Sequence, residues 1–82
     1  MKNTIMVRLK TAKDVMKFVR ECSTFEEDID ITAGRYIIDA KSIMGVFSLD
    51  LSKPLHVEIN STDELTCEDF KQRLHIFGVD EN

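Results

Sequence analysis

The sequence of 82 residues has little cysteine and no long apolar run, and each shortage excludes a class of protein. Cys22 and Cys67 are too few and too far apart for a disulfide framework or a zinc motif, so we expect two reduced small hydrophobes within helices. The N-terminal residues run directly into alternating polarity, which predicts neither a secretory signal nor a membrane span. We therefore expect a cytoplasmic protein that does not bind membranes.

An excess of positive charge and the motifs of enzyme active sites are missing too. Fifteen acidic residues against eleven lysines and arginines give a net charge of −4, which is unfavourable for direct nucleic-acid binding. No glycine-rich phosphate loop, nucleophile elbow or metal-ligand spacing occurs, and His56 and His75 have no obvious nucleophile or acid partner. The acidic residues between positions 26 and 30 are expected to be solvated, because strand alternation points neighbouring carboxylates to opposite sides. We predict no enzyme activity, no metal and no cofactor.

What is present indicates one small folded domain spanning residues 1–82. Hydrophobic residues make up 43% of the chain and charged residues 32%, as in an ordinary globular protein and unlike a disordered segment. Repeats, linkers and low-complexity stretches are absent from the sequence. A chain of this length buries roughly 60% of its unfolded surface, so we expect little surplus stability.

Apolar spacing predicts a strand followed by a helix at the start of the chain. Every second residue from 5 to 9 is apolar, which is typical of a half-buried strand. Apolar residues then recur at helical spacing over residues 12–22, and Thr11 precedes Asp14 by three positions, as in a helix cap. We interpret Thr11 as this cap and not as a catalytic residue.

The middle of the chain alternates again and predicts a hairpin and a fourth strand. Residues 29–32 and 36–40 alternate on either side of a turn at residues 33–35. A short helix is expected between this hairpin and Pro54, because proline disfavours helical geometry in the residue before it. Residues 55–60 alternate once more, as in a strand.

A third helix is predicted after residue 63. We expect Thr66 and Asp69 to form its cap and Gly78 to end it. The element order is then β-α-β-β-α-β-α, which predicts the α+β class with a four-stranded antiparallel sheet and three helices on one face.

The short helix, within residues 41–49, is the most informative stretch, because it begins with a serine and is apolar on more than one side. At about 100° per residue, Val46 and Leu49 share one face, and we assign them to the core together with Leu51. The opposite face carries the residues that we call the apolar patch: Ile43, Met44 and Phe47. This patch is either an exposed docking surface or packed beneath a neighbouring loop.

Ser42 has two compatible interpretations. Its hydroxyl is suited to cap the short helix by accepting a hydrogen bond from a backbone amide two or three residues further on. The same hydroxyl is also suited to carry a phosphate beside the positive end of a helix. The residues alone are compatible with a Ser42 that only caps the helix and with a Ser42 that caps it and is also phosphorylated as a regulatory switch.

Residues 41–45, Lys-Ser-Ile-Met-Gly, resemble the regulatory-serine segment of the HPr family, the small phosphocarrier proteins of the bacterial sugar phosphotransferase system. The likeness continues without gaps from about residue 25 to residue 51 and through the strand at 55–59, and more loosely along most of the chain. It implies the open-faced sandwich fold of HPr, phosphorylation of Ser42, and partner binding through the apolar patch.

The family's carrier histidine is missing. HPr proteins hold a histidine at the start of the first helix, whereas this chain has no histidine before His56. Alignment on Ser42 puts Thr11 at the position of that histidine, Lys13 at that of the family arginine and Asp14 at that of the proline. A phosphothreonine ester is stable, whereas a phosphoimidazole passes its phosphoryl group on readily. The resemblance therefore implies a protein that has lost the histidine relay.

Lys13 belongs to a basic stripe on the first predicted helix, formed by Lys10, Lys13, Lys17 and Arg20. A solvated helix face is one interpretation of this stripe. The resemblance adds that Lys13 contacts a phosphate or a partner, although lysine offers a point charge where arginine offers a planar two-pronged grip.

The resemblance thus implies a regulatory protein of the phosphotransferase and carbon-catabolite-repression type, similar to the catabolite-repression paralogue of HPr. Its expected partners are an HPr serine kinase/phosphatase and a transcriptional regulator, met through the apolar patch and Lys13. Two alternatives stay open: a constitutive adaptor that uses the same patch without phosphorylation, and a residual relay on His56 or His75.

Overall fold

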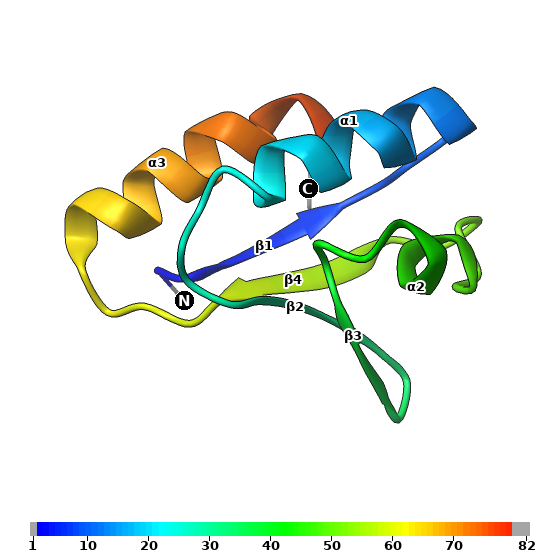
Figure 1. The fold of residues 1–82 in the computed structure, drawn as a ribbon, viewed down its shortest axis with the longest axis horizontal. Helices are drawn as coiled ribbons and strands as arrows, with labels where there is room; N and C mark the ends of the chain where they lie inside the picture. The colour runs from blue at the N-terminus through cyan, green and yellow to red at the C-terminus, as the bar shows by residue number, and fades with distance from the viewer. Residues whose placement is uncertain (1, 80–82) are drawn as a thin grey trace.

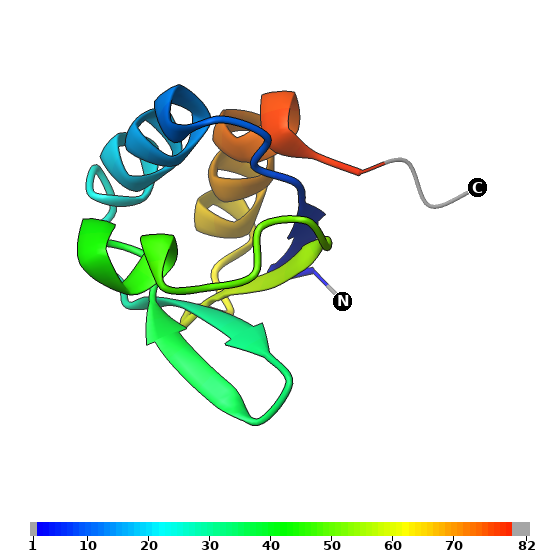
Figure 2. The same cartoon turned by 90° about the vertical axis from the view of Figure 1, so that its right-hand side faces the viewer.

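The structure, a computed structural model, describes residues 2–79, and in them three α-helices cover one face of a four-stranded antiparallel sheet (Figures 1 and 2). The strands lie in the order β1-β4-β2-β3. The predicted fold class and element order are confirmed. The elements are β1 (Thr4–Val7), α1 (Ala12–Cys22), β2 (Ile29–Ala33), β3 (Tyr36–Asp39), α2 (Ile43–Phe47), β4 (Leu55–Ile59), α3 (Glu64–Leu74) and a final 3-10 helix, η1 (His75–Phe77).

The core lies between the sheet and the helices because both contribute one apolar face. In β2, Ile29 and Ile31 are buried while Asp30 and Thr32 are exposed, so the predicted alternation is confirmed there. The helices add buried side chains at helical spacing, including both predicted helical cysteines. These helical core residues are Val15, Phe18, Val19, Cys22, Cys67, Phe70 and Leu74.

The hairpin of β2 and β3 turns at Gly34, as predicted. Ala33 and Tyr36 pair directly across the turn, so Gly34 and Arg35 form a two-residue loop. Gly34 has φ of 61°, and no non-glycine residue among residues 2–79 has positive φ. A positive φ at the first loop position alone is typical of a type II′ turn, whose twist matches that of the flanking strands.

The predicted cap of the last helix is wrong. The helix begins at Glu64, and Asp63 caps it by accepting hydrogen bonds from the backbone amide and the hydroxyl of Thr66, both at 2.9 Å. Thr66 is therefore inside the first turn, and its hydroxyl donates to Asp63 instead of accepting from Asp69. Gly78 follows η1 as its C-cap, as expected, but with an extended backbone at φ of −63° and not in the left-handed region.

The short helix is shorter than its apolar spacing predicts. It ends at Phe47, where Ser48 turns back by donating its hydroxyl to Gly45 O at 2.6 Å. Leu49 and Leu51 consequently lie beyond the helix. They are partly buried and pack against the core, and Val46 is the fully buried residue of α2.

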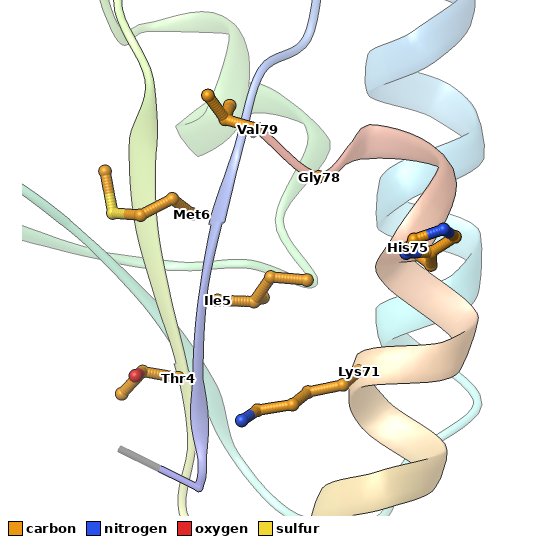
Figure 3. Close-up of a pocket in the computed structure, with 7 residues that line it drawn as sticks. All are labelled: Thr4, Ile5, Met6, Lys71, His75, Gly78 and Val79. Carbon is orange, nitrogen blue, oxygen red and sulfur yellow. The ribbon is translucent and has the colours of Figure 1, made fainter. Parts of the chain in front are cut away.

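One edge of the sheet is covered by the residues that follow η1. Val79 N donates to Met6 O at 3.0 Å, Arg8 N donates to Phe77 O at 2.8 Å, and Val7 bridges to Gly78. Figure 3 shows Gly78 and Val79 beside β1, at the rim of a cavity of about 500 Å³ that is also lined by Lys71 and His75. The C-terminal end of the β1 edge is thus covered, whereas β3 forms the opposite edge of the sheet.

Candidate functional site

Ser42 lies where β3 turns into α2. Its backbone amide donates to Asp39 O at 3.0 Å, and Lys41 N donates to Asp39 Oδ1 at 2.9 Å. Lys41 is held in turn by its side chain, whose Nζ donates to Phe25 O at 2.7 Å. The position of Ser42 is therefore defined by the strand on one side and by the loop after α1 on the other.

The cap predicted at Ser42 is confirmed. Its backbone is extended, with φ of −99° and ψ of 108°, and its Oγ accepts a hydrogen bond from Gly45 N at 3.1 Å. Val46 N donates to the Ser42 carbonyl at 2.9 Å and closes the first turn. Ser42 as a whole is half-buried. Its phosphorylation stays a prediction.

Gly45 has a structural role that the sequence analysis missed. A Cβ at this position would lie 2.8 Å from Ile38 Cγ2 and 3.2 Å from Ser42 Oγ. Contacts this short force one of the neighbours to move, so the absence of a side chain lets α2 lie directly on β3. The signal in the sequence was a glycine inside a short helix, where it otherwise lowers helix stability.

The apolar patch is exposed. Met44 is 81% exposed, Phe47 43% and Ile43 40%, whereas Val46 on the other side of the same helix is fully buried. The interpretation that a neighbouring loop covers the patch is therefore wrong for the part of the chain that the structure describes. Single exposed apolar residues are common, whereas here three of the five residues of α2 are exposed beside a serine cap, and their use as a docking surface stays a prediction.

Thr11 caps α1, as predicted. Its Oγ1 accepts from Asp14 N at 3.1 Å, and Asp14 Oδ2 accepts in return from Lys10 N at 3.0 Å. The arrangement is similar to a capping box, except that Asp14 accepts from the amide of Lys10, the residue before the cap, and not from that of Thr11. The Thr11 hydroxyl thus stabilises the helix end, and its alignment with the family's carrier histidine stays a prediction.

The basic stripe on α1 is solvent-exposed. None of its four side chains forms an ion pair within residues 2–79, so Lys13 is not committed to a neighbour there. α1 and α2 contact each other, and each contributes buried residues to the common core. A role for Lys13 in binding a phosphate or a partner stays a prediction.

The two histidines lie in elements other than α1. His56 is half-buried in β4, and His75 is exposed at the start of η1. Within residues 2–79 no group of histidine, cysteine, aspartate and glutamate has the arrangement of a metal site. In the same part of the chain no helix combines the length and apolarity that crossing a membrane requires.

Comparison with known proteins identifies the family. The sequence profile described as the PTS HPr component phosphorylation site matches residues 10–71, which include both Thr11 and Ser42. A comparison with curated protein sequences gives no match.

Solved structures agree with the profile. HPr-C-His from Thermoanaerobacter tengcongensis is 25% identical over 90% of this chain and 89% of its own, with a TM-score of 0.71. The phosphocarrier protein HPr from Bacillus anthracis is 22% identical over 90% and 94%, with a TM-score of 0.65. Crh, the Bacillus subtilis catabolite repression containing protein, is 22% identical over 90% and 88%, with a TM-score of 0.63, in a structure described as a swapped dimer. The profile match over most of the chain, together with this shared fold, shows that the protein belongs to the HPr family of phosphotransferase-system phosphocarriers.

Proposed function

We propose that this protein is a regulatory HPr-like protein that does not carry phosphoryl groups on histidine and that is switched by phosphorylation of Ser42. HPr proteins are phosphocarriers and not enzymes, and they act through protein partners. The observation that carries the proposal is the hydroxyl of Ser42, a half-buried residue that begins α2 directly beside the exposed Ile43 and Met44.

Loss of the relay follows from the chemistry at the start of α1. Relay through a carrier needs a phosphorylated group that is easily cleaved, as the nitrogen of an imidazole provides. Alignment on Ser42 puts Thr11, the cap of α1, at the corresponding position, and its hydroxyl would form a stable ester. Since no histidine precedes His56 in the sequence, α1 offers no replacement.

Phosphorylation would change the apolar patch electrostatically. A phosphate adds about −1.5 to −2 charges at neutral pH and three strong acceptor oxygens. Ser42 is next to the patch in the chain, so a partner that binds Met44 and Phe47 would meet this charge at the edge of its contact. Lys13, exposed on α1, would offer a cation to such a phosphate or to an acidic partner surface.

The proposed setting is the cytoplasm and the phosphotransferase and catabolite-repression system. The proposed partners are an HPr serine kinase/phosphatase and a transcriptional regulator. The fold likeness to Crh, whose description names catabolite repression, is compatible with this role but at 22% identity supports the fold alone. The whole of residues 1–82 is proposed to act as a single domain.

Intact-mass measurement after incubation with an HPr serine kinase and ATP tests the switch. The wild-type chain should gain one phosphate and Ser42→Ala none. Ser48→Ala is a matched control, because Ser48 is an exposed serine at the other end of α2 and also bonds to Gly45. It should be phosphorylated like wild type. No phosphate on the wild-type chain, or a phosphate that persists in Ser42→Ala, would exclude the proposed switch.

The adaptor alternative is favoured by one observation, the exposure of the apolar patch itself. Partner capture with unmodified Ser42 separates the two functions. An adaptor would lose its partner in Phe47→Asp but not in Met16→Asp, which changes a comparably exposed residue of α1 (50% against 43%). A partner that binds only the phosphorylated chain would support the switch.

A further inference from the structure

The outer edge of β3 is open. β3 is the last strand of the order β1-β4-β2-β3, and no segment of residues 2–79 pairs with its outer side. The opposite edge, at β1, is covered at its C-terminal end by Gly78 and Val79. Figure 2 shows the hairpin of β2 and β3 extending away from the layer formed by α1 and α3. An open strand edge is a template for pairing with another chain.

The backbone of Ile37 faces outward from this edge. Ala40 N donates to Ile29 O at 2.8 Å, which fixes the phase of the ladder between β2 and β3. In an antiparallel pair, successive residues direct their backbone amide and carbonyl alternately toward the partner strand and away from it. The amides and carbonyls of Tyr36 and Ile38 are therefore directed toward β2. The amide and carbonyl of Ile37 are therefore directed to solvent, where another strand could bind them.

The Ile37 side chain is also available for contact. It is 70% exposed and lies on the face of the sheet without helices, since its neighbour Ile38 packs toward the core. Asp39, two residues after Ile37 in the strand, shares this face, and Arg35, two residues before Ile37, is the last residue of the turn that leads into β3.

Arg35 and Asp39 make this edge complementary to itself. When two copies of β3 pair in antiparallel register about Ile37, Arg35 of each copy is opposite Asp39 of the other, and Ile37 is opposite Ile37. A parallel arrangement would put like charges together. Neither charged side chain forms an ion pair within residues 2–79, and of the two Asp39 carboxylate oxygens only Oδ1 accepts a hydrogen bond there, from Lys41 N.

We propose that β3 is a homodimer interface, in which two copies pair their β3 strands antiparallel about Ile37 and join their sheets into one. The occupant of the edge is a second copy because the sequence Arg35-Tyr36-Ile37-Ile38-Asp39 complements its own reverse in charge. The strand is four residues long, so the contact is small and the dimer is weak and exchanges rapidly.

This interface is argued from residues other than those around Ser42. α2 packs on β3 from the helix side, where Gly45 approaches Ile38, whereas Ile37 lies on the other side of the strand. The dimer proposal therefore does not rest on the proposed phosphorylation, and either one can fail alone. Its consequence is a particle that presents two copies of the apolar patch.

Analytical ultracentrifugation over a concentration series from about 10 µM to about 1 mM tests the dimer, since small interfaces bind in this range. Wild type should shift from monomer to dimer. Ile37→Lys should stay monomeric, whereas Ile76→Lys should dimerise like wild type, because Ile76 is equally exposed (73%) but lies in η1. Circular dichroism confirms that both variants fold.

A charge reversal tests the register. Arg35→Glu should weaken the dimer by about tenfold or more, because symmetry changes two Arg35–Asp39 pairs at once. Arg8→Glu, an exposed arginine next to β1, changes the net charge equally and should leave the association constant within about twofold of wild type. Three results would overturn the proposal. The first is a wild-type chain that stays monomeric at about 1 mM, and the second is a dimer that survives Ile37→Lys, as a dimer formed by strand exchange would. The third is an equal effect of Arg35→Glu and Arg8→Glu on the association constant.

Discussion

At the scale of single residues, Gly45 sets how closely α2 approaches the sheet. Adding a Cβ brings it to 2.8 Å from Ile38 Cγ2, a methyl group on a stiff branched side chain. Overpacking costs about 1–3 kcal/mol, and the gain in helix propensity returns roughly 1 kcal/mol. We expect Gly45→Ala to lower the free energy of unfolding by about 1 kcal/mol in urea denaturation.

The partner residue supplies the control for this prediction. In an Ile38→Ala background the methyl group that blocks position 45 is gone, so Gly45→Ala should become neutral or stabilising. A substitution that is equally destabilising in both backgrounds would show that the contact with Ile38 is not the reason for the glycine.

Cys22 illustrates a residue whose chemistry is suppressed by its position. Burial in the core raises the pKa of its thiol to about 12, with the nearby Lys41 acting in the opposite direction. The reactive thiolate is therefore scarce at pH 8, and access is blocked as well. Native protein should react with a thiol reagent only as fast as it opens, whereas both cysteines should react at once in denaturant. One rapidly reacting thiol in the native protein would contradict the described burial.

At the scale of elements, α3 depends on the ionised form of Asp63. The backbone amide of Thr66, and then its hydroxyl, hold the pKa of Asp63 below its ordinary value. A lowered pKa in the folded state stabilises the fold above the unfolded pKa of about 3.9 and loses this effect as the pH falls through the folded value. Acid should therefore weaken this cap.

Asp63→Asn should flatten the loss of stability below about pH 4, because asparagine still accepts the capping hydrogen bond but does not titrate there. Urea midpoints measured from neutral pH to about pH 2.5 give the comparison. Glu68→Gln, which removes an exposed carboxylate from the same helix, is the control. Its urea midpoint should fall with decreasing pH more nearly as that of wild type does. The interpretation is wrong if Asp63→Asn follows the wild-type acid curve.

Local patterns predicted some caps and failed at others for a physical reason. Thr11 and Ser42 were predictable because each hydroxyl stands three residues before the amide that it accepts from. Near α3, Asp63 and Thr66 both have this spacing to a later polar residue. The sequence does not show which of the two begins the helix. In the structure Asp63 is the cap, and its own amide donates to Ser61 Oγ at 3.1 Å.

At the scale of the whole molecule, strict alternation in β2 and β4 made the antiparallel sheet predictable, but not its strand order. The neighbours of each strand depend on contacts distant in the sequence, such as Ile31 with Val57. The same limit applies to the candidate site. The cap and the exposed patch follow from helical spacing, whereas the contact between Gly45 and Ile38 exists only after α2 has packed on β3. The single-domain organisation of residues 1–82 stays a prediction.

Ser42 is the proposed phosphate acceptor, in an HPr-family protein that we propose to have lost the histidine relay. The most direct test is intact mass after incubation with enzyme I and phosphoenolpyruvate, or with HPr serine kinase and ATP, each read before and after acid treatment. We predict one phosphate from ATP that survives acid and none from phosphoenolpyruvate. An acid-labile phosphate on His56 or His75, or no phosphate from ATP, would contradict the account.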